Sequence, residues 1–342
     1  MLAVAAKDGV PLGVVDLNTW AREPEGFGDR ARRCRVLPAA EKETVKWIRA
    51  IHCGTQFKRD LTDQSTVVTL VQDREGEPYS VLLEADEVRS EVKLLVRAQH
   101  NRVLSGDGTR LWDFVASRPV AGKMTVETSA QEDRPARRAT LRLRWASVTI
   151  NPPPKRPKGE KKGRAIRVNA ILAEETPRKG VANPISWQLL TTRDVRTSED
   201  AAKCVRDYAR RWTIETYFKV LKSECKTEER AFRTLDRVEK LLRVDALIAW
   251  MLLFMVTVVR TDPDRPCTDL FTEDEWRVVS IVKGGGRQRT NPPTLGEMVG
   301  WLAEIGGHKG RPRDGPPGAK VVRRGLEQIV FGVELWACLT KG

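Results

Sequence analysis

One stretch of the sequence, DYARRWTIETYFKVLK at residues 207–222, constrains the fold more than any other and has a strongly helical character. Five residues with polar side-chain groups recur in it at spacings of 3, 4, 4 and 3. At ~100° per residue, these spacings place all five on one narrow stripe of a helix. They are Tyr208, Arg211, Glu215, Lys219 and Lys222. The stretch therefore predicts a helix that presents one carboxylate among three cations and a phenol.

The apolar residues of this predicted helix lie on an adjacent stripe, which can dock on a core. They are Ile214, Tyr217, Phe218 and Leu221. A single acid held among cations suits a metal ion whose ligands are shared with phosphate oxygens. The other interpretation is a solvated helix face with ion pairs four residues apart, such as Glu215 with Lys219.

The order Tyr-x2-Arg-x3-Glu-x6-Lys, formed by Tyr208, Arg211, Glu215 and Lys222, resembles the signature helix of the insertion-sequence-four-like group of transposases. A second segment supports the resemblance. Residues 66–75, TVVTLVQDRE, are similar to the strand that carries the second catalytic aspartate of these enzymes, followed by Arg-Glu. The resemblance extends over most of the chain. It implies a DDE transposase with an α/β, ribonuclease-H-like core that is interrupted by a β-rich insertion.

Metal-dependent phosphoryl transfer on DNA needs carboxylates that converge from separate elements. The resemblance implies that Asp73, at a strand end, and Glu215, on the signature helix, are catalytic ligands of Mg²⁺ or Mn²⁺. Without the downstream helix, Asp73 would be read as a strand-capping or turn residue. Three other acids remain fallback candidates: Asp86, Glu75 and Glu77.

The family's site has three acids, and the first lies on an opening strand that precedes the hairpin predicted over residues 2–17. Asp16 could replace it only if two more strands followed, and residues 20–40 are too loop-like to supply them. We therefore expect Asp16 to end a strand and cap a turn. On this resemblance the chain is an N-terminally truncated transposase that lacks the first catalytic aspartate, so its activity is expected to be impaired.

The resemblance also assigns contacts with DNA. Tyr208, Arg211, Lys219 and Lys222 match positions that grip the transposon end, and cations suit phosphate contacts. Trp187 lies on a predicted strand where some members stack a flipped base on an aromatic ring; a core aromatic is the other interpretation. The expected partners are the double-stranded DNA of transposon ends and target, and a second copy of the chain in a homodimer. Four further aromatics are predicted to lie in the core: Trp212, Phe218, Trp250 and Trp301.

Composition agrees with a polyanionic partner. The formal charge is +14, from 60 Lys and Arg against 46 Asp and Glu, and the cations are spread through the chain. Ribosomal, RNA-binding and membrane-surface proteins share this basicity, so charge alone does not identify an activity. The six cysteines form no close pair, which argues against a zinc site or a disulfide framework and favours a reducing compartment.

The patterns of strand-like and helix-like segments divide the chain into four regions. Residues 1–90 form the first part of the core, and residues 91–184 are predicted to be a strand-rich insertion that includes a basic, proline-rich loop at 151–164. Residues 185–262 complete the core with the signature helix, expected at about 198–224, and a long apolar helix at 235–261. Residues 263–342 are predicted to be helical and are a candidate dimerisation region. The individual strands are expected at 2–6, 11–17, 67–71, 93–96, 124–128, 140–150, 166–173 and 185–191, and the other helices at 41–57, 273–282, 294–305 and 321–337.

Membrane insertion is not expected. The N-terminus has no apolar signal segment because Lys7 and Asp8 interrupt it, and the uncharged run at residues 246–259 is too short to span a bilayer. We interpret that run as a buried core helix. The resemblance implies a cytoplasmic bacterial protein that is associated with the nucleoid when bound to DNA.

Two other functions remain open. The chain could be a non-catalytic remnant that binds DNA or dimerises, acting as an inhibitor through mixed dimers. It could also be a basic RNA-binding protein, although it contains no aromatic motif of the RNP type.

Overall fold

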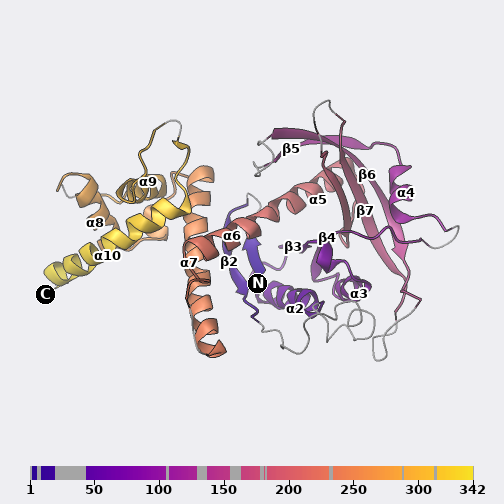
Figure 1. Cartoon of the computed structure of the whole chain (residues 1–342), viewed down its shortest axis with the longest axis horizontal. Coiled ribbons are helices and arrows are strands. Elements are labelled where there is room, and N and C mark those ends of the chain that lie inside the picture. The colour runs from indigo at the N-terminus through magenta and orange to yellow at the C-terminus, as the bar shows by residue number, and fades with distance from the viewer. Residues whose placement is uncertain are drawn as a thin grey trace. The chain divides into compact units, whose positions relative to one another are not determined.

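The computed structural model of the chain describes residues 2–5, 9–19, 44–104, 108–128, 137–154, 163–177, 181, 183–230, 234–286, 289–311 and 314–341. It is a mixed α/β structure with a helical C-terminal region (Figure 1). The chain forms two compact units. One consists of Trp20–Arg211, and the other combines Met1–Thr19 with Trp212–Gly342. The four regions predicted from sequence patterns divide the chain differently and remain predictions.

The unit Trp20–Arg211 contains a six-stranded sheet with the order β3-β4-β8-β7-β6-β5. β3 and β4 are parallel, and every other neighbouring pair is antiparallel. β3 therefore lies at one edge of the sheet, beside a parallel partner. The strands are β3 (Val68–Gln72), β4 (Val92–Arg97), β5 (Gly122–Thr128), β6 (Arg137–Ile150), β7 (Ile166–Glu175) and β8 (Ser186–Thr191). All six were predicted from the sequence, with ends that differ by at most three residues.

Helices in this unit precede, join or follow the strands. They are α2 (Val45–Asp60), the short η3 (Arg74–Gly76), α3 (Tyr79–Glu87), α4 (Leu111–Ala116) and α5 (Ser198–Arg210). α5 begins at a capping box, in which the Thr197 hydroxyl accepts from the Asp200 amide and the Asp200 carboxylate accepts from the Thr197 amide. Backbone and side-chain hydrogen bonds from Arg196 and Thr197 lower the pKa of Asp200. The cap therefore fixes where α5 begins.

The apolar face of α5 packs on the sheet. Ala201, Val205 and Tyr208 share a buried cluster with Leu141 and Leu189. The small Ala201 has no exposed surface, so the helix lies close to the strands. This packing holds α5 on the sheet, with β6 as its main neighbour.

The second unit contains the N-terminal hairpin and the remaining helices. β1 (Leu2–Ala5) pairs antiparallel with β2 (Pro11–Asp16), as predicted, and Asp16 is the last residue of its strand. Lys7 and Asp8 of the predicted turn lie outside the described residues. The helices are α6 (Trp212–Ser223), α7 (Leu235–Thr261), η4 (Cys267–Asp269), α8 (Glu273–Lys283), α9 (Leu295–Ile305) and α10 (Ala319–Lys341).

α7 is the central helix of this unit's core. The residues predicted to be a buried core helix are confirmed as such, since Ala249, Leu252 and Met255 are fully or almost fully buried. The Trp250 indole donates to the Pro11 carbonyl oxygen at 2.9 Å, which ties the hairpin to α7. α7 is long and apolar enough to cross a membrane, but half of its apolar window is buried within the protein. A single helix of this kind is weak evidence for a membrane span.

Other predicted features fall wholly or partly outside the described residues: the Arg- and Gly-rich loop at about 22–38, residues 41–43 at the start of the predicted first helix, the basic tip at 155–162, and parts of the C-terminal loops at 287–288 and 312–313. Cys34 also lies there, and the five described cysteines are free thiols.

Candidate functional site

Asp73 lies where the sequence placed it, directly after β3 at the carboxyl end of the parallel β3–β4 pair. Its Oδ1 accepts a hydrogen bond from the Glu75 amide at 3.0 Å and caps η3. Within the described part of the chain this is the only hydrogen bond to its carboxylate, and the side chain is half-buried. One carboxylate oxygen is therefore open to a ligand from solvent. Carboxyl ends of parallel strands are places where α/β proteins bind ligands.

The donor chemistry at Asp73 fits a hard cation, because Mg²⁺ and Mn²⁺ prefer carboxylate oxygens. Among the described residues no group of three or more His, Cys, Asp or Glu could hold a metal ion. Glu215 belongs to the other unit. Asp73 fits as one ligand of such an ion, and its metal role remains a prediction.

Two fallback acids near Asp73 already have protein partners. Glu77 has no exposed surface, and its carboxylate accepts from the side chains of His100 and Arg102. Glu75 is exposed and forms an ion pair with Lys46 at 2.6 Å. These contacts give Glu77 a structural role and leave Glu75 on a solvated surface.

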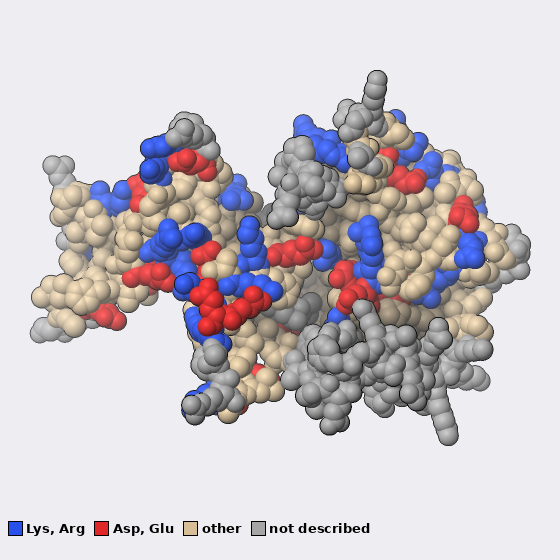
Figure 2. Space-filling view, viewed as in Figure 1, with Lys and Arg blue, Asp and Glu red and all other residues tan. Residues whose placement is uncertain are grey.

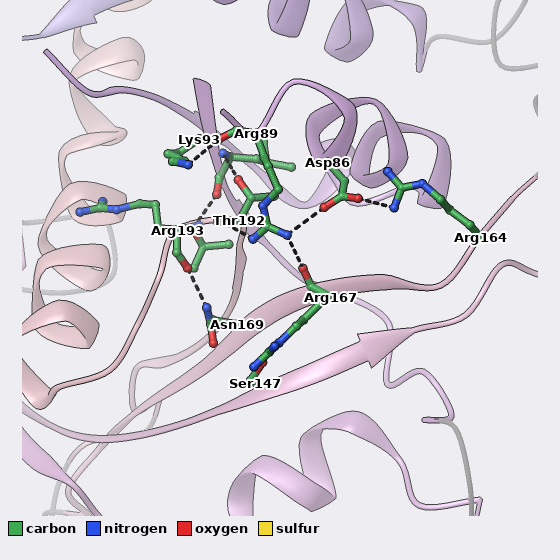
Figure 3. A network of polar contacts seen from close by, with 11 residues as sticks. Asp86, Arg89, Lys93, Ser147, Arg164, Arg167, Asn169, Thr192 and Arg193 are labelled. Carbon is green, nitrogen blue, oxygen red and sulfur yellow. Dashed lines mark hydrogen bonds and ion pairs between the residues drawn. The ribbon is translucent and has the colours of Figure 1, made fainter. Parts of the chain in front are cut away.

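The third fallback acid, Asp86 on α3, is itself buried and lies in a network of polar contacts that reaches the surface. Figure 3 shows its carboxylate between the guanidinium groups of Arg89, at 3.0 Å, and Arg164, at 2.5 Å. Arg89 also donates to the carbonyl oxygens of Arg167 and Thr192. The network therefore joins α3 to β7 and to the residue that follows β8, and both oxygens of Asp86 are occupied by cations.

We expect Asp86→Ala to lower the free energy of unfolding by about 2 kcal/mol, because it leaves the partly buried Arg89 guanidinium and the exposed Arg164 guanidinium without their carboxylate. The matched control is Glu75→Ala, which also removes an ion-paired acid but at an exposed position, and should cost less than about 0.5 kcal/mol. Urea unfolding monitored by tryptophan fluorescence measures both. Equal losses in the two variants would contradict a structural role for Asp86.

The predicted signature helix forms, but as two helices and not one. α5 ends at Arg210 and α6 begins at Trp212, so the helix breaks at Arg211. The Arg211 amide instead donates to the Tyr208 carbonyl three residues earlier. Arg211 keeps helical backbone angles, with φ −52° and ψ −29°, so the interruption is a single tight turn. The prediction of one uninterrupted helix was therefore wrong.

Three of the assigned DNA-binding residues come together in the unit Trp20–Arg211. The Trp187 ring meets the Tyr208 ring edge-on, with centroids 5.4 Å apart, and the Arg211 guanidinium lies 5.9 Å from the Tyr208 centroid. Tyr208 is buried in the α5–sheet core, whereas Trp187 and Arg211 are half-buried. The phenol thus serves as packing between a half-exposed indole and a guanidinium. Trp187 is packed against the core, yet part of its side chain reaches the surface.

The other assigned residues lie on α6. Glu215 is half-buried, and Lys219 and Lys222, four and seven residues later, are exposed on the same side of the helix. Lys222 forms an exposed ion pair with Glu228 at 2.8 Å. α6 therefore presents one acid and two cations side by side.

The other side of α6 anchors it. Tyr217 is buried and donates from its hydroxyl to the Ala246 carbonyl oxygen on α7 at 2.8 Å. Burial raises the pKa of this phenol, so it remains a neutral donor. Val220 and Leu221 share the same core.

Two aromatics assigned to the core are not buried. Trp212 is 44% exposed and Phe218 is 38% exposed. Both lie on α6, whose packing face is occupied by Tyr217, Val220 and Leu221. Trp250 and Trp301 are partly buried and pack against the core, as predicted.

An exposed apolar face on α10 was not predicted from the sequence. Val322 and Ile329 pack inward, but Phe331 and Leu339 on the opposite side are 73% and 74% exposed. Leu335 lies between them and is also exposed. The sequence contained a signal for this face, because residues 319–341 carry apolar side chains on two faces of the helix. A helix that packs on a single core needs only one apolar face.

Cations are not confined to one element. On the face drawn in Figure 2, Lys and Arg side chains are spread over both units and are interspersed with acidic side chains. This distribution agrees with the spread of basic residues along the sequence.

Comparison with known protein families gave two matches. Residues 35–252, well over half of the chain, match the family described as Transposase DDE domain. Residues 247–338 match the Transposase Tn5 dimerisation domain. The first match contains Asp73 and the whole of α5 and α6, and the second contains α8, α9 and most of α10.

Proposed function

This chain belongs to the DDE transposase family, and from that premise we propose that it is a transposase whose chemistry is metal-dependent cleavage and strand transfer at the ends of a transposable element, with its activity impaired because two of three acids are assigned. The observation that carries the proposal is the position of Asp73, a half-buried carboxylate with one oxygen open at the carboxyl end of a parallel strand pair. Asp73 and Glu215 are the proposed catalytic acids. The proposed assignment to the insertion-sequence-four-like group rests on the spacing of Tyr208, Arg211, Glu215 and Lys222.

We assign a ribonuclease-H-like core to the segment that runs from α2 to α6. Its support is the sequence of elements, in which α2, β3, α3 and β4 alternate and give two adjacent parallel strands. β3 is the edge strand of its sheet. A further strand that paired with this edge could bring a third acid beside Asp73.

Asp73 and Glu215 would hold the divalent cation, Mg²⁺ or Mn²⁺. When bound, such an ion stabilises developing negative charge on phosphoryl oxygens and promotes ionisation of an attacking hydroxyl. The residues of the chain would position the DNA. Lys219 and Lys222 lie on the same side of α6 as Glu215, so a phosphate at the acid would be close to cations that neutralise it.

Tyr208, Arg211, Lys219, Lys222 and Trp187 are the proposed DNA contacts. Trp187 keeps both of its interpretations: it packs edge-on against Tyr208, and its half-exposed face could stack on an unpaired base. The burial of Tyr208 favours an indirect role, in which the phenol supports Trp187 and Arg211.

The binding proposal is tested by titrating duplex DNA at several salt concentrations. We expect affinity to fall steeply as salt rises, because each neutralised phosphate releases counterions. Lys222→Ala and Arg211→Ala should each weaken binding by roughly three- to ten-fold and reduce the slope of log K against log salt by about 1.

Lys240→Ala provides a matched control. Lys240, like Lys222, is an exposed lysine in a 2.8 Å ion pair, but it lies on α7 and pairs with Asp236. It should bind DNA within about two-fold of the wild type, since loss of an exposed ion pair has little effect by itself. A DNA affinity that does not depend on salt, or equal losses of affinity in Lys222→Ala and Lys240→Ala, would argue against contacts between α6 and DNA phosphates.

The match to a dimerisation domain suggests that the family's dimer forms through the C-terminal region. We propose that the exposed face of α10 (Phe331, Leu335 and Leu339) contacts a second copy of the chain. A localisation in the bacterial cytoplasm, at the nucleoid, follows from this proposed activity on DNA.

A second candidate function is inhibition of transposition without catalysis. Its support is that two catalytic acids are assigned, whereas the resemblance implies a site with three. A chain that dimerises and binds DNA with an incomplete acid set would act as an inhibitor, because mixed dimers would contain one impaired subunit. Cleavage assays distinguish this function from catalysis.

A further inference from the structure

Glu77 forms the most fully satisfied buried carboxylate near Asp73. It has no exposed surface. Its Oε2 accepts from the amides of Gln99 and His100, at 3.0 and 3.1 Å, and lies 2.5 Å from His100 Nδ1. Its Oε1 accepts from Arg102 Nε at 3.1 Å. One buried acid thus holds the whole segment 99–102.

This contact joins the two loops that follow β3 and β4, at the carboxyl ends of these strands. Glu77 follows β3 and η3, and residues 99–102 follow β4. β3 and β4 are parallel, with Gln72 opposite Val96, so both loops begin at the carboxyl ends of the strands, where Asp73 also lies. The His100 side chain is therefore held at the same strand ends as the proposed catalytic acid.

The contact also fixes the His100 ring. A carboxylate oxygen can only accept, so Nδ1 carries the proton and Nε2 is left to face other partners. The main chain is fixed as well, because the Trp112 indole donates to the His100 carbonyl oxygen at 3.2 Å and the Trp112 amide donates to the Asn101 side chain. The His100 side chain is 56% exposed. Within the described part of the chain, Nε2 has no hydrogen bond.

A purely structural role does not require this histidine. Two backbone amides and Arg102 already satisfy the buried carboxylate and join the two loops. The imidazole is the only one of these donors that is mostly in solvent. Its contact with Glu77 therefore orients an exposed ring, as carboxylates orient functional histidines elsewhere.

We propose that His100 is a phosphate-contacting residue of the DNA site, with Glu77 as its positioning residue. In the imidazolium form the ring donates from Nδ1 to Glu77 and from Nε2 to a phosphate oxygen of DNA lying near Asp73. This proposal rests on the proposed action on DNA and adds a contact that the sequence motifs did not contain. Hydrogen bonds to charged groups contribute more than neutral ones, so the contact should be measurable.

Chemical footprinting of the full chain tests the contact directly. Diethyl pyrocarbonate modifies exposed imidazoles, and mass spectrometry of peptides gives the rate at each histidine. We expect saturating duplex DNA to slow modification of His100 by about five-fold or more, in proportion to the occupied fraction. His52 is the internal control, because its Nε2 also pairs with a glutamate, Glu84 at 2.7 Å, and its side chain is 59% exposed, but on α2. His52 should react equally with and without DNA.

Inorganic phosphate provides a second arm. Phosphate at the same concentration of phosphate groups should leave His100 reactive, since a single contact to a free ion is weak. Protection by free phosphate alone would assign the ring to a small anion and overturn the DNA contact.

Binding by variants gives an independent measure. His100→Ala should weaken duplex affinity by about ten-fold, the loss of one hydrogen bond to a charged group, whereas His52→Ala should stay within about two-fold. Because the His100 ring is exposed, circular dichroism should show unchanged folding. If the wild type binds DNA and His100 is neither protected nor needed, this inference fails alone. If the wild type does not bind DNA, the proposed function fails first and this inference with it.

Discussion

Residues 1–342 should show little or no DNA cleavage with Mg²⁺ or Mn²⁺. The same chain extended at its N-terminus by a strand that bears a third acid should cleave about a thousand times faster, since a metal site supplies several kcal/mol of charge stabilisation. The reason is the ligand set. Asp73 and Glu215 are two assigned acids, and a hard cation binds weakly between two carboxylates and phosphate oxygens. The substrate is a plasmid that carries the genomic sequences flanking the gene, and nicked and linear products are measured over time.

In the extended protein, Asp73→Asn and Glu215→Gln should each return cleavage to the background. The amides are close in size to the acids but lack the negative charge that holds the metal. Asp86→Asn and Glu75→Gln are the matched controls, because both acids have cationic protein partners in the structure. They should retain most of the rate in protein that remains folded. Robust cleavage by residues 1–342 that is insensitive to Glu215→Gln would place the active site elsewhere.

The sheet could be predicted from the sequence because its strands have simple patterns. The apolar run before Asp73 forms the edge strand β3 and buries Leu70, and the alternation of Leu141, Leu143 and their cationic neighbours matches a strand with one buried face. Pairing partners could not be predicted. β8, a predicted core strand, pairs with β4 and with β7, which both fall in the predicted insertion. The predicted core strands β3 and β8 therefore share one sheet with the strands of the predicted insertion. α3 and α4 were missed because helices of nine and six residues give little periodic signal.

The sequence predicted which residues carry the chemistry of the candidate site, but not how their side chains are arranged. The strand end identified Asp73, and the spacing of Glu215, Lys219 and Lys222 identified one side of α6. The pattern treated Tyr208 as polar, although its ring fills the α5–sheet core, and it could not foresee the break at Arg211. The Glu77–His100 pair was also invisible, since the two residues are 23 positions apart in the chain and meet only because β3 and β4 are parallel neighbours.

Phe331→Asp should raise the dissociation constant of the dimer by about a hundred-fold or more. Phe331 is the most exposed large aromatic of the described residues, and burying such a side chain contributes about 2 kcal/mol. A symmetric dimer contains each substituted position twice, so the lost burial and the desolvation of a carboxylate both count double. Sedimentation equilibrium of the full chain measures the constant. Leu335→Asp should act in the same direction, because Leu335 lies one helical turn further along the same face.

The control is Val103→Asp, which introduces the same charge at an exposed apolar residue outside residues 247–338. It should leave the dissociation constant within about two-fold of the wild type, since a charge in solvent costs little. The inward packing of α10 through Val322 and Ile329 is untouched by these changes, so thermal unfolding of the Phe331→Asp monomer should remain cooperative. A dimer that persists in both α10 variants would exclude this face and require the second copy to bind another surface. A chain that is monomeric as the wild type would remove mixed dimers, and with them the inhibitor function.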